Sequence, residues 1–348
     1  MQPHQRLTSL DGLRGWGALS VVLFHVFVIG FPSSPEAGEA LRRIFIFNGE
    51  LAVWIFFVVS GFSLSLGFMT KGDRRSVVRT ALGRYARLAI PIASATLLVM
   101  AAGPWLVDPA QRPPLFRDFV TEAPSLHEAL RFSLVDVFFH YDARTSPIPP
   151  LWTMAYELFG SVAVFATLLV FGTWRWRVVG YAAVAASVYI LHPIYTAFMA
   201  GVMLAAAHVQ WPKAESVTRY TLPLVLVGCA WLVRNEPGRL SIPAAILITW
   251  CAISNSHFSA FLGHRLSRWL GSISFPLYLT HSTVFYAFSL AMPSGLVTNL
   301  LTVAVALVLA TIFIPTDRLG VWAARRMGAL VFLAGTPKAA GPAKPQNQ

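Results

Sequence analysis

The sequence predicts an all-α integral membrane protein, a bundle of about ten transmembrane helices with both termini in the cytoplasm. Of its 348 residues, 56% are hydrophobic and 12% are charged, about half the charged fraction of an ordinary soluble domain. The apolar residues form continuous blocks, and a block that crosses lipid must bond its backbone within a helix or a closed barrel. Because the blocks do not alternate apolar and polar residues as barrel strands do, helices are favoured.

The net charge of +12 raises the question of a nucleic-acid partner, but a basic excess in a membrane protein is usually an orientation signal. We therefore expect the lipid bilayer, and no nucleic acid, as a partner. Two cysteines are present, Cys229 and Cys251, and both lie inside apolar runs. This pattern supplies neither a disulfide framework nor a cysteine-based metal cluster, so no metal site is expected.

The predicted spans follow the apolar blocks in chain order. Each block, with its flanks, approaches the roughly 20 residues that cross a bilayer as a helix. The first block is not a cleaved signal peptide, because Asp11 and Arg14 stand at its start and no small-residue cleavage site follows before Pro32. The blocks comprise residues 16–29, 51–68, 88–106, 158–171, 222–233, 242–253, 277–292 and 296–314.

One stretch, Trp176 to Val209, is consistent with a single long helix or with two short helices that break at His192-Pro193. With two helices, most Lys and Arg residues of the loops fall on the side of the N-terminus. With one helix, they divide almost evenly between the two sides. Because short cytoplasmic loops carry the Lys/Arg excess, the arrangement with two helices is preferred.

The longest outer loop, Val107 to Pro150, contains apolar residues at helical spacing from Leu126 to Phe138. This spacing predicts an amphipathic helix on the outer surface, where it could act as a lid. Residues 1–335 are expected to form one membrane domain. Residues 336–348, rich in Pro, Ala and Lys, are expected to form a disordered tail.

The first span carries two ionisable side chains in the segment LDGLRGWGALSVVLFH, residues 10–25. Arg14 and His25 are eleven residues apart, about three helical turns, so both project from one face roughly 16 Å apart along the axis. Gly12 and Gly15, with Gly17, would let neighbouring backbones approach closely. Arg14 could be an interface anchor and His25 a hydrogen-bonding residue between helices, but ionisable residues in spans are usually functional.

Three further segments carry polar residues into the membrane. The second span contains IFFVVSGFSL with Ser60 and Gly61, which could admit a thin ligand arm or simply pack a helix. The fourth span opens with PLWTMAYELFG and carries the carboxylate of Glu157. The basic loop contains GRYARLAIP with Arg84 and Arg87, whose charge the positive-inside rule alone would also explain.

The ninth span reads GSISFPLYLTH, residues 271–281. Gly271, Ser274, Tyr278 and His281 follow one another at spacings of 3, 4 and 3 residues, which places them on one face of the helix. A polar stripe on an apolar helix is expected to face protein or a cavity rather than lipid.

Together these segments resemble the membrane acyltransferase family 3, whose members move acyl groups from acyl-CoA to sugars and related acceptors. The similarity lies in R-x10-H after D-G-L-R-G, in F-F-x-x-S-G-F, in W-T-x-x-x-E and in the segment around Y-L-x-H, in the family's order. Trp54 stands where the family often has a polar residue, and Phe275 replaces an aromatic of the ninth-span motif. The resemblance reaches from Leu10 to His281.

The resemblance implies a division of roles. His25, Glu157, Tyr278 and His281 are the expected catalytic residues, and Arg14, Ser60, Gly61, Arg84 and Arg87 are expected to hold acyl-CoA. The arginines would bind the phosphates, because guanidinium groups bind phosphate bidentately. His25 would act as a general base or form an acyl-histidine, and both routes stay open. Glu157 would orient His25, while Tyr278, Ser274 or His281 would donate to the oxyanion.

The implied reaction is an O-acyl transfer, with acetyl as the expected group, from cytoplasmic acyl-CoA to a carbohydrate or glycolipid hydroxyl on the extracytoplasmic side. Acyl-CoA would be a co-substrate and no cofactor would be bound permanently. The expected location is the inner (plasma) membrane of a bacterium, with or without a partner subunit. A transporter or flippase of a glycan or lipid-linked substrate is the main alternative, since buried His, Arg and Glu also line translocation paths. A passive structural subunit is the third.

Overall fold

The computed structural model describes residues 7–30, 35–103, 110, 124–143, 146–211, 228 and 241–333. Every regular element in these ranges is a helix, which confirms the predicted all-α class. The expected tail, residues 336–348, lies outside the described residues. In chain order the elements are α1 (Thr8–Leu23), η1 (Phe24–Gly30), α2 (Pro35–Arg42), η2 (Phe45–Phe47), α3 (Gly49–Lys71), α4 (Arg74–Ala102), α5 (Leu126–Arg131), η6 (Phe132–Asp136), α6 (Val137–Phe139), η7 (Pro149–Trp152), α7 (Thr153–Phe171), α8 (Arg177–Leu191), α9 (Pro193–Gln210), α11 (Ser241–Ser254), α12 (Ser256–Leu262), α13 (Arg265–Ala291), α14 (Leu296–Ile312) and α15 (Ile314–Leu333).

Several of these helices are long and apolar enough to cross a membrane. There are five of them among the described residues, and seven if each of two bent helix pairs counts as one span. The protein is therefore multi-pass, but the predicted count of ten is not confirmed. One reason is that α8 has only 15 residues, fewer than the roughly 20 that a span needs. A second is that the expected span at 222–233 lies outside the described residues.

The helix break at His192 agrees with the interpretation as two helices. The backbone of His192 is extended between α8 and α9, and Pro193 begins α9. Proline suits the first position of a helix, because its missing N–H would have no partner there. The His192 side chain caps the new helix, accepting the backbone N–H of Ile194 at 3.3 Å.

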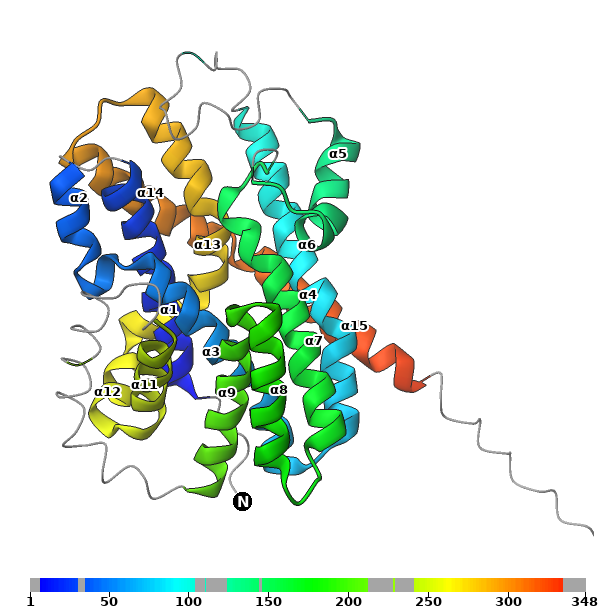
Figure 1. Ribbon diagram of the computed structural model, residues 1–348. Helices are drawn as coiled ribbons and strands as arrows, with labels where there is room; N and C mark the ends of the chain where they lie inside the picture. Colours follow the sequence, from blue (N-terminus) through cyan, green and yellow to red (C-terminus); the bar gives the residue numbers. More distant parts are fainter. Residues whose placement is uncertain are drawn as a thin grey trace, which may run out of the picture.

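The segment from α5 through η6 to α6 forms the helix predicted inside the outer loop. It begins with a capping box in which Ser125 and Glu128 bond each other's backbone N–H. Val137 and Phe138 are buried, whereas Leu126 is 58% exposed. The segment packs on α4 and α7 (Figure 1). A helix in this part of the loop is confirmed, but the apolar face only in part, because Leu130 and Leu134 are exposed as well. Its action as a lid stays a prediction.

The centre of the bundle is built from helices far apart in sequence. The first helix, α1, packs along both α3 and α13, while α3 also packs along α9 (Figure 1). At Gly15 the backbones of α1 and α13 almost touch, since an added Cβ would lie 2.4 Å from the backbone nitrogen of Gly271. An added Cβ at Gly12 would lie 2.1 Å from the carbonyl oxygen of Leu262. The predicted close approach at these glycines is confirmed.

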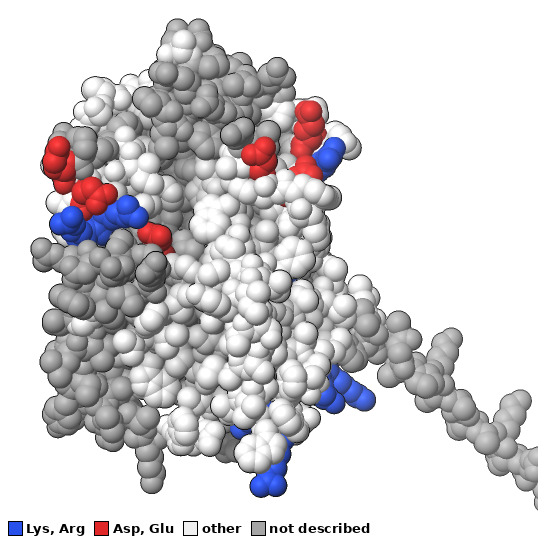
Figure 2. All heavy atoms as spheres, viewed as in Figure 1, with Lys and Arg blue, Asp and Glu red and all other residues white. Residues whose placement is uncertain are grey.

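Charged side chains avoid a broad central band of the face shown in Figure 2. Acidic and basic side chains lie along its upper part, and only Lys and Arg appear along its lower part. A belt without charges between two charged rims is typical of a bundle that crosses a bilayer.

Candidate active site

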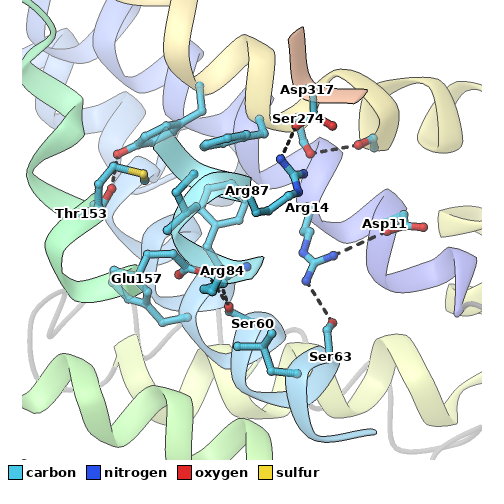
Figure 3. A pocket seen from close by; sticks show the side chains of 18 of the residues that line it. Asp11, Arg14, Ser60, Ser63, Arg84, Arg87, Thr153, Glu157, Ser274 and Asp317 are labelled. Atoms are coloured by element: carbon cyan, nitrogen blue, oxygen red, sulfur yellow. Dashed lines mark hydrogen bonds and ion pairs between the residues drawn. The ribbon is translucent and has the colours of Figure 1, made fainter. Parts of the chain in front are cut away.

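A cavity of about 430 Å³ lies among α1, α3, α4, α7, α13 and α15. It contains six charged side chains, three cationic and three anionic (Figure 3). Seven of the residues expected from the sequence to form the site line this cavity, whereas Gly61, His25 and His281 do not. The seven are Arg14, Ser60, Arg84, Arg87, Glu157, Ser274 and Tyr278.

Arg84 on α4 is held by α3 and α7. Its Nε donates to Ser161 Oγ at 2.8 Å, and its terminal nitrogen pairs with the Glu157 carboxylate and lies 3.3 Å from Ser60 Oγ. Ser60 in turn donates to Glu157 at 2.5 Å. The side chains of Arg84 and Glu157 are only 16% and 14% exposed. The charges of Arg84 and Glu157 therefore offset each other within one hydrogen-bonded cluster.

The partner expected for Glu157 is wrong. Glu157 was expected to orient His25, but its carboxylate pairs with Arg84 and accepts a hydrogen bond from Ser60. The physical reason is charge: in a site of low polarity a carboxylate is stabilised more by a guanidinium than by a neutral imidazole. Arg84, expected to contact phosphate, is occupied by the same pairing.

The other two cavity arginines also face carboxylates. Arg14 Nη1 lies 3.6 Å from Asp11 Oδ1, and its Nη2 donates to Ser63 at 3.0 Å. Arg87 Nη1 lies 2.7 Å from Asp317 Oδ1, with the guanidinium 5.4 Å from the centre of the Phe275 ring (Figure 3). Asp11 and Asp317 were not predicted as site residues. The available signal was an acidic side chain just before the first apolar block, Asp11, and another just after the last, Asp317.

Tyr278 lies at the inner wall of the cavity and is 6% exposed. Its hydroxyl bonds the carbonyl oxygen of Pro150 and lies 2.7 Å from Thr153 Oγ1. Because a carbonyl only accepts, the single phenolic proton goes to Pro150 and Thr153 donates to Tyr278. The expected donation from Tyr278 to an oxyanion is therefore not available in this arrangement. Thr153 is the threonine of the W-T-x-x-x-E motif, for which no role was predicted.

His25 and His281 lie side by side, next to Tyr278. His281 Nε2 lies 3.3 Å from His25 Nδ1, and the ring centres are 5.1 Å apart. His25 Nδ1 also lies 2.9 Å from the Val21 carbonyl oxygen, while His281 Nδ1 lies 3.0 Å from that of Leu277. Carbonyls accept only, so in the neutral rings both Nδ1 atoms carry the proton. His281 Nε2 is then an acceptor for His25.

The hydrogen bonds of the pair leave one reactive atom. Within the part of the chain that the structure describes, His25 Nε2 has no hydrogen-bond partner, and with Nδ1 protonated it carries a lone pair. His281 was expected to donate to an oxyanion, but its lone pair accepts from His25 and its proton is bonded to its own helix. His25 stands at the second position of η1, a π-helical segment of a kind often found at functional sites.

Tyr278 connects the cavity with the histidine pair. Its side chain lines the cavity, and its ring lies 6.1 Å from the ring of His281. It also meets Phe56, another residue of the cavity wall, edge to face at 6.3 Å. The histidine pair therefore lies next to the part of the cavity wall that Tyr278 forms.

Gly61 does not face a ligand. An added Cβ at this residue would lie 2.0 Å from the carbonyl oxygen of Phe198, so α3 and α9 pack backbone to backbone there. Of the two uses that the sequence left open for Gly61, its contacts are those of helix packing. Among the described residues, no group of three His, Cys, Asp or Glu side chains is placed to hold a metal ion.

A family model described as an acyltransferase domain matches residues 7–316. The matched range includes all the cavity residues named above except Asp317, which follows it directly. Neither the search of curated proteins nor the search of solved structures gave a match.

Proposed function

This chain belongs to the acyltransferase 3 family of membrane proteins, and from that premise we propose that it moves an acyl group from acyl-CoA to a carbohydrate or glycolipid hydroxyl. We propose acetyl as the group, the cytoplasm as the source of the donor and the extracytoplasmic side as the location of the acceptor. The membrane would be the inner (plasma) membrane of a bacterium. The observation that carries the proposal is the lone pair of His25 Nε2, beyond a cavity lined by three arginines.

The cavity suits the phosphate end of coenzyme A. Guanidinium groups keep their charge when buried and bind phosphate oxygens bidentately. Arg84 and Arg87 lie on α4, whose N-terminal turns belong to the basic loop that the positive-inside rule assigns to the cytoplasm. A donor entering from that side would meet these charges first. Its pantetheine arm would then extend past Phe56 and Tyr278 to bring the thioester to the histidine pair.

At the histidine pair the acceptor hydroxyl would give its proton to His25 Nε2 while its oxygen attacks the thioester carbonyl carbon. The tetrahedral intermediate then collapses, the C–S bond breaks, and the imidazolium returns the proton to the sulfur. The products are an ester and free coenzyme A. His281 Nε2 supports this step by accepting from His25 Nδ1–H, which holds the ring and stabilises its cationic form.

Direct attack by His25 Nε2 on the thioester is the second route, and it uses the same lone pair. The C–S bond would break as the N–C bond forms, with coenzyme A leaving as a thiolate. The acceptor hydroxyl would then attack the acyl carbon, return the lone pair to His25 Nε2 and give its proton to the thiolate. In both routes the acyl group crosses the membrane while the coenzyme stays on its side. Acyl-CoA is a co-substrate in each, and no permanently bound cofactor takes part.

The test is release of free coenzyme A from acetyl-CoA by the purified protein supplied with a glycan extract. We expect release that requires the glycan, is lost in His25→Gln and persists in His264→Gln, a control whose side chain is exposed and makes no cap hydrogen bond. If acetyl-CoA binds but no free coenzyme A is released, the glycan extract lacks the acceptor or acetyl is not the acyl group that the protein transfers. Absence of acyl-CoA binding by folded protein would refute the enzyme and favour a transporter or flippase.

A further inference from the structure

The helix α15 packs closely against α4 at two points. An added Cβ at Gly83 of α4 would lie 2.4 Å from the carbonyl oxygen of Ala324. One at Gly320 of α15 would lie 3.0 Å from the Pro91 ring and 3.2 Å from the carbonyl oxygen of Arg87. Two helices in such close contact hold a fixed register. The contact places Asp317, one turn before Gly320, beside the guanidinium of Arg87 (Figure 3). Two residues of α15 that follow the end of the family match, Asp317 and Val321, thus line the cavity.

The pair of Arg87 and Asp317 differs from the Arg84 cluster in how well it is bonded. The side chains are 28% and 19% exposed, and Nη1 lies 2.7 Å from Oδ1. Nevertheless, these two buried atoms are not aligned for a hydrogen bond, with each other or with another described residue. Arg84, in contrast, donates to Ser161, Ser60 and Glu157. The contact between Arg87 and Asp317 is therefore mainly an attraction of charges.

Phe275 holds Arg87 independently of the carboxylate. Its ring centre lies 5.4 Å from the guanidinium carbon, within the range of a cation–π contact. Loss of Asp317 would thus leave the guanidinium beside the cavity. The three cavity arginines face three carboxylates, so the empty cavity has no net charge, and an incoming phosphate must compete with the carboxylate for Arg87.

We propose that Asp317 is an exchangeable counter-charge for Arg87: it occupies the guanidinium in the empty cavity and yields it to a phosphate group of the acyl donor. The proposal rests on the proposed function, since it assigns a positioning residue to the donor site. Arg87 is then the arginine that changes partner, and Arg84 is the one that stays with Glu157. Asp317 limits the affinity for the coenzyme and thereby favours release of the product.

The experiment measures the Kd of coenzyme A for purified protein in detergent by titration calorimetry. For Asp317→Asn we expect binding about fivefold tighter than wild type, the low end of ordinary coupling between two sites. For Arg87→Gln we expect binding about tenfold weaker, because a charge-assisted hydrogen bond is lost. The double variant should bind like Arg87→Gln alone, since Asp317 acts only through Arg87.

The matched control is Asp136→Asn, which removes another carboxylate paired with an arginine, Arg131 at 3.4 Å, but outside the cavity. Its Kd should equal that of wild type. If Asp317→Asn does not fold, as judged by a thermal melt, Asp317→Ser replaces it with the same expected tightening. Unchanged or weaker binding in the folded variant would overturn the exchange while leaving the proposed function intact. Failure of folded wild type to bind coenzyme A would overturn both.

Discussion

The arginine-lined cavity and the histidine pair both adjoin Tyr278, and they are built from different contacts. In the cavity each guanidinium faces a carboxylate from another turn or another helix. In the histidine pair two rings are fixed by backbone carbonyls of their own helices and by each other. The protein thus keeps fixed charge, which suits binding of an anion, apart from a lone pair, which suits proton transfer.

The largest expected effect comes from a substitution that breaks the histidine pair. His281→Phe keeps a ring of similar shape, and the Val21 carbonyl still accepts the Nδ1–H of His25. The variant removes the second acceptor, His281 Nε2, which would stabilise the cationic form of His25, so we expect kcat to fall by about 10³-fold. Donor affinity should change little, because the cavity is untouched. Steady-state kinetics with a separate coenzyme A titration measures both quantities. A large rise in Kd with unchanged kcat would mean that the two regions are not separate.

The next effect concerns stability and tests whether the Arg84 cluster is structural. Glu157→Gln leaves the Arg84 charge buried without its counter-charge, which should lower the free energy of unfolding by about 3 kcal/mol. Glu39→Gln is the control, because its partner Arg42 is 3.7 Å away and the pair is exposed; it should change stability by about 0–1 kcal/mol. Melting curves in detergent compare the two. Equal melting temperatures would contradict a structural role for the cluster.

The smallest expected effect lies at the boundary between the regions. Tyr278→Phe removes the hydroxyl that bonds Pro150 and Thr153, at a cost of about 1 kcal/mol in stability. Because the phenolic proton is already bonded, kcat should fall less than tenfold. A decrease of about 10²-fold or more, with normal donor binding, would instead identify Tyr278 as an oxyanion donor.

Parts of both regions could be predicted from the sequence. Arg14, Arg84 and Arg87, together with His25 and His281, were identified from residue type, spacing and the family resemblance. The pairing within each region could not be predicted. His25 and His281 are 256 residues apart in the chain, and Arg84 and Glu157 are 73 apart. Helical periodicity shows which residues share a face of one helix, but it carries no information on which helix that face meets.

The helical structure and the membrane location follow from the amino-acid sequence without knowledge of the packed bundle. Long apolar stretches have only one way to satisfy their backbone in lipid, and that constraint acts locally along the chain. The sequence also determined the break at His192 and the close packing at Gly12 and Gly15, because proline and glycine act on the backbone directly.

Which charges and lone pairs meet depends on tertiary packing. Glu157 pairs with Arg84 and not with His25, and the Tyr278 hydroxyl donates to the Pro150 carbonyl. Asp317 of α15 lies beside Arg87. These contacts depend on the register between helices, which is set by how closely two backbones approach over their whole length. The identity of a side chain is local information, whereas its partner is a property of the packed bundle.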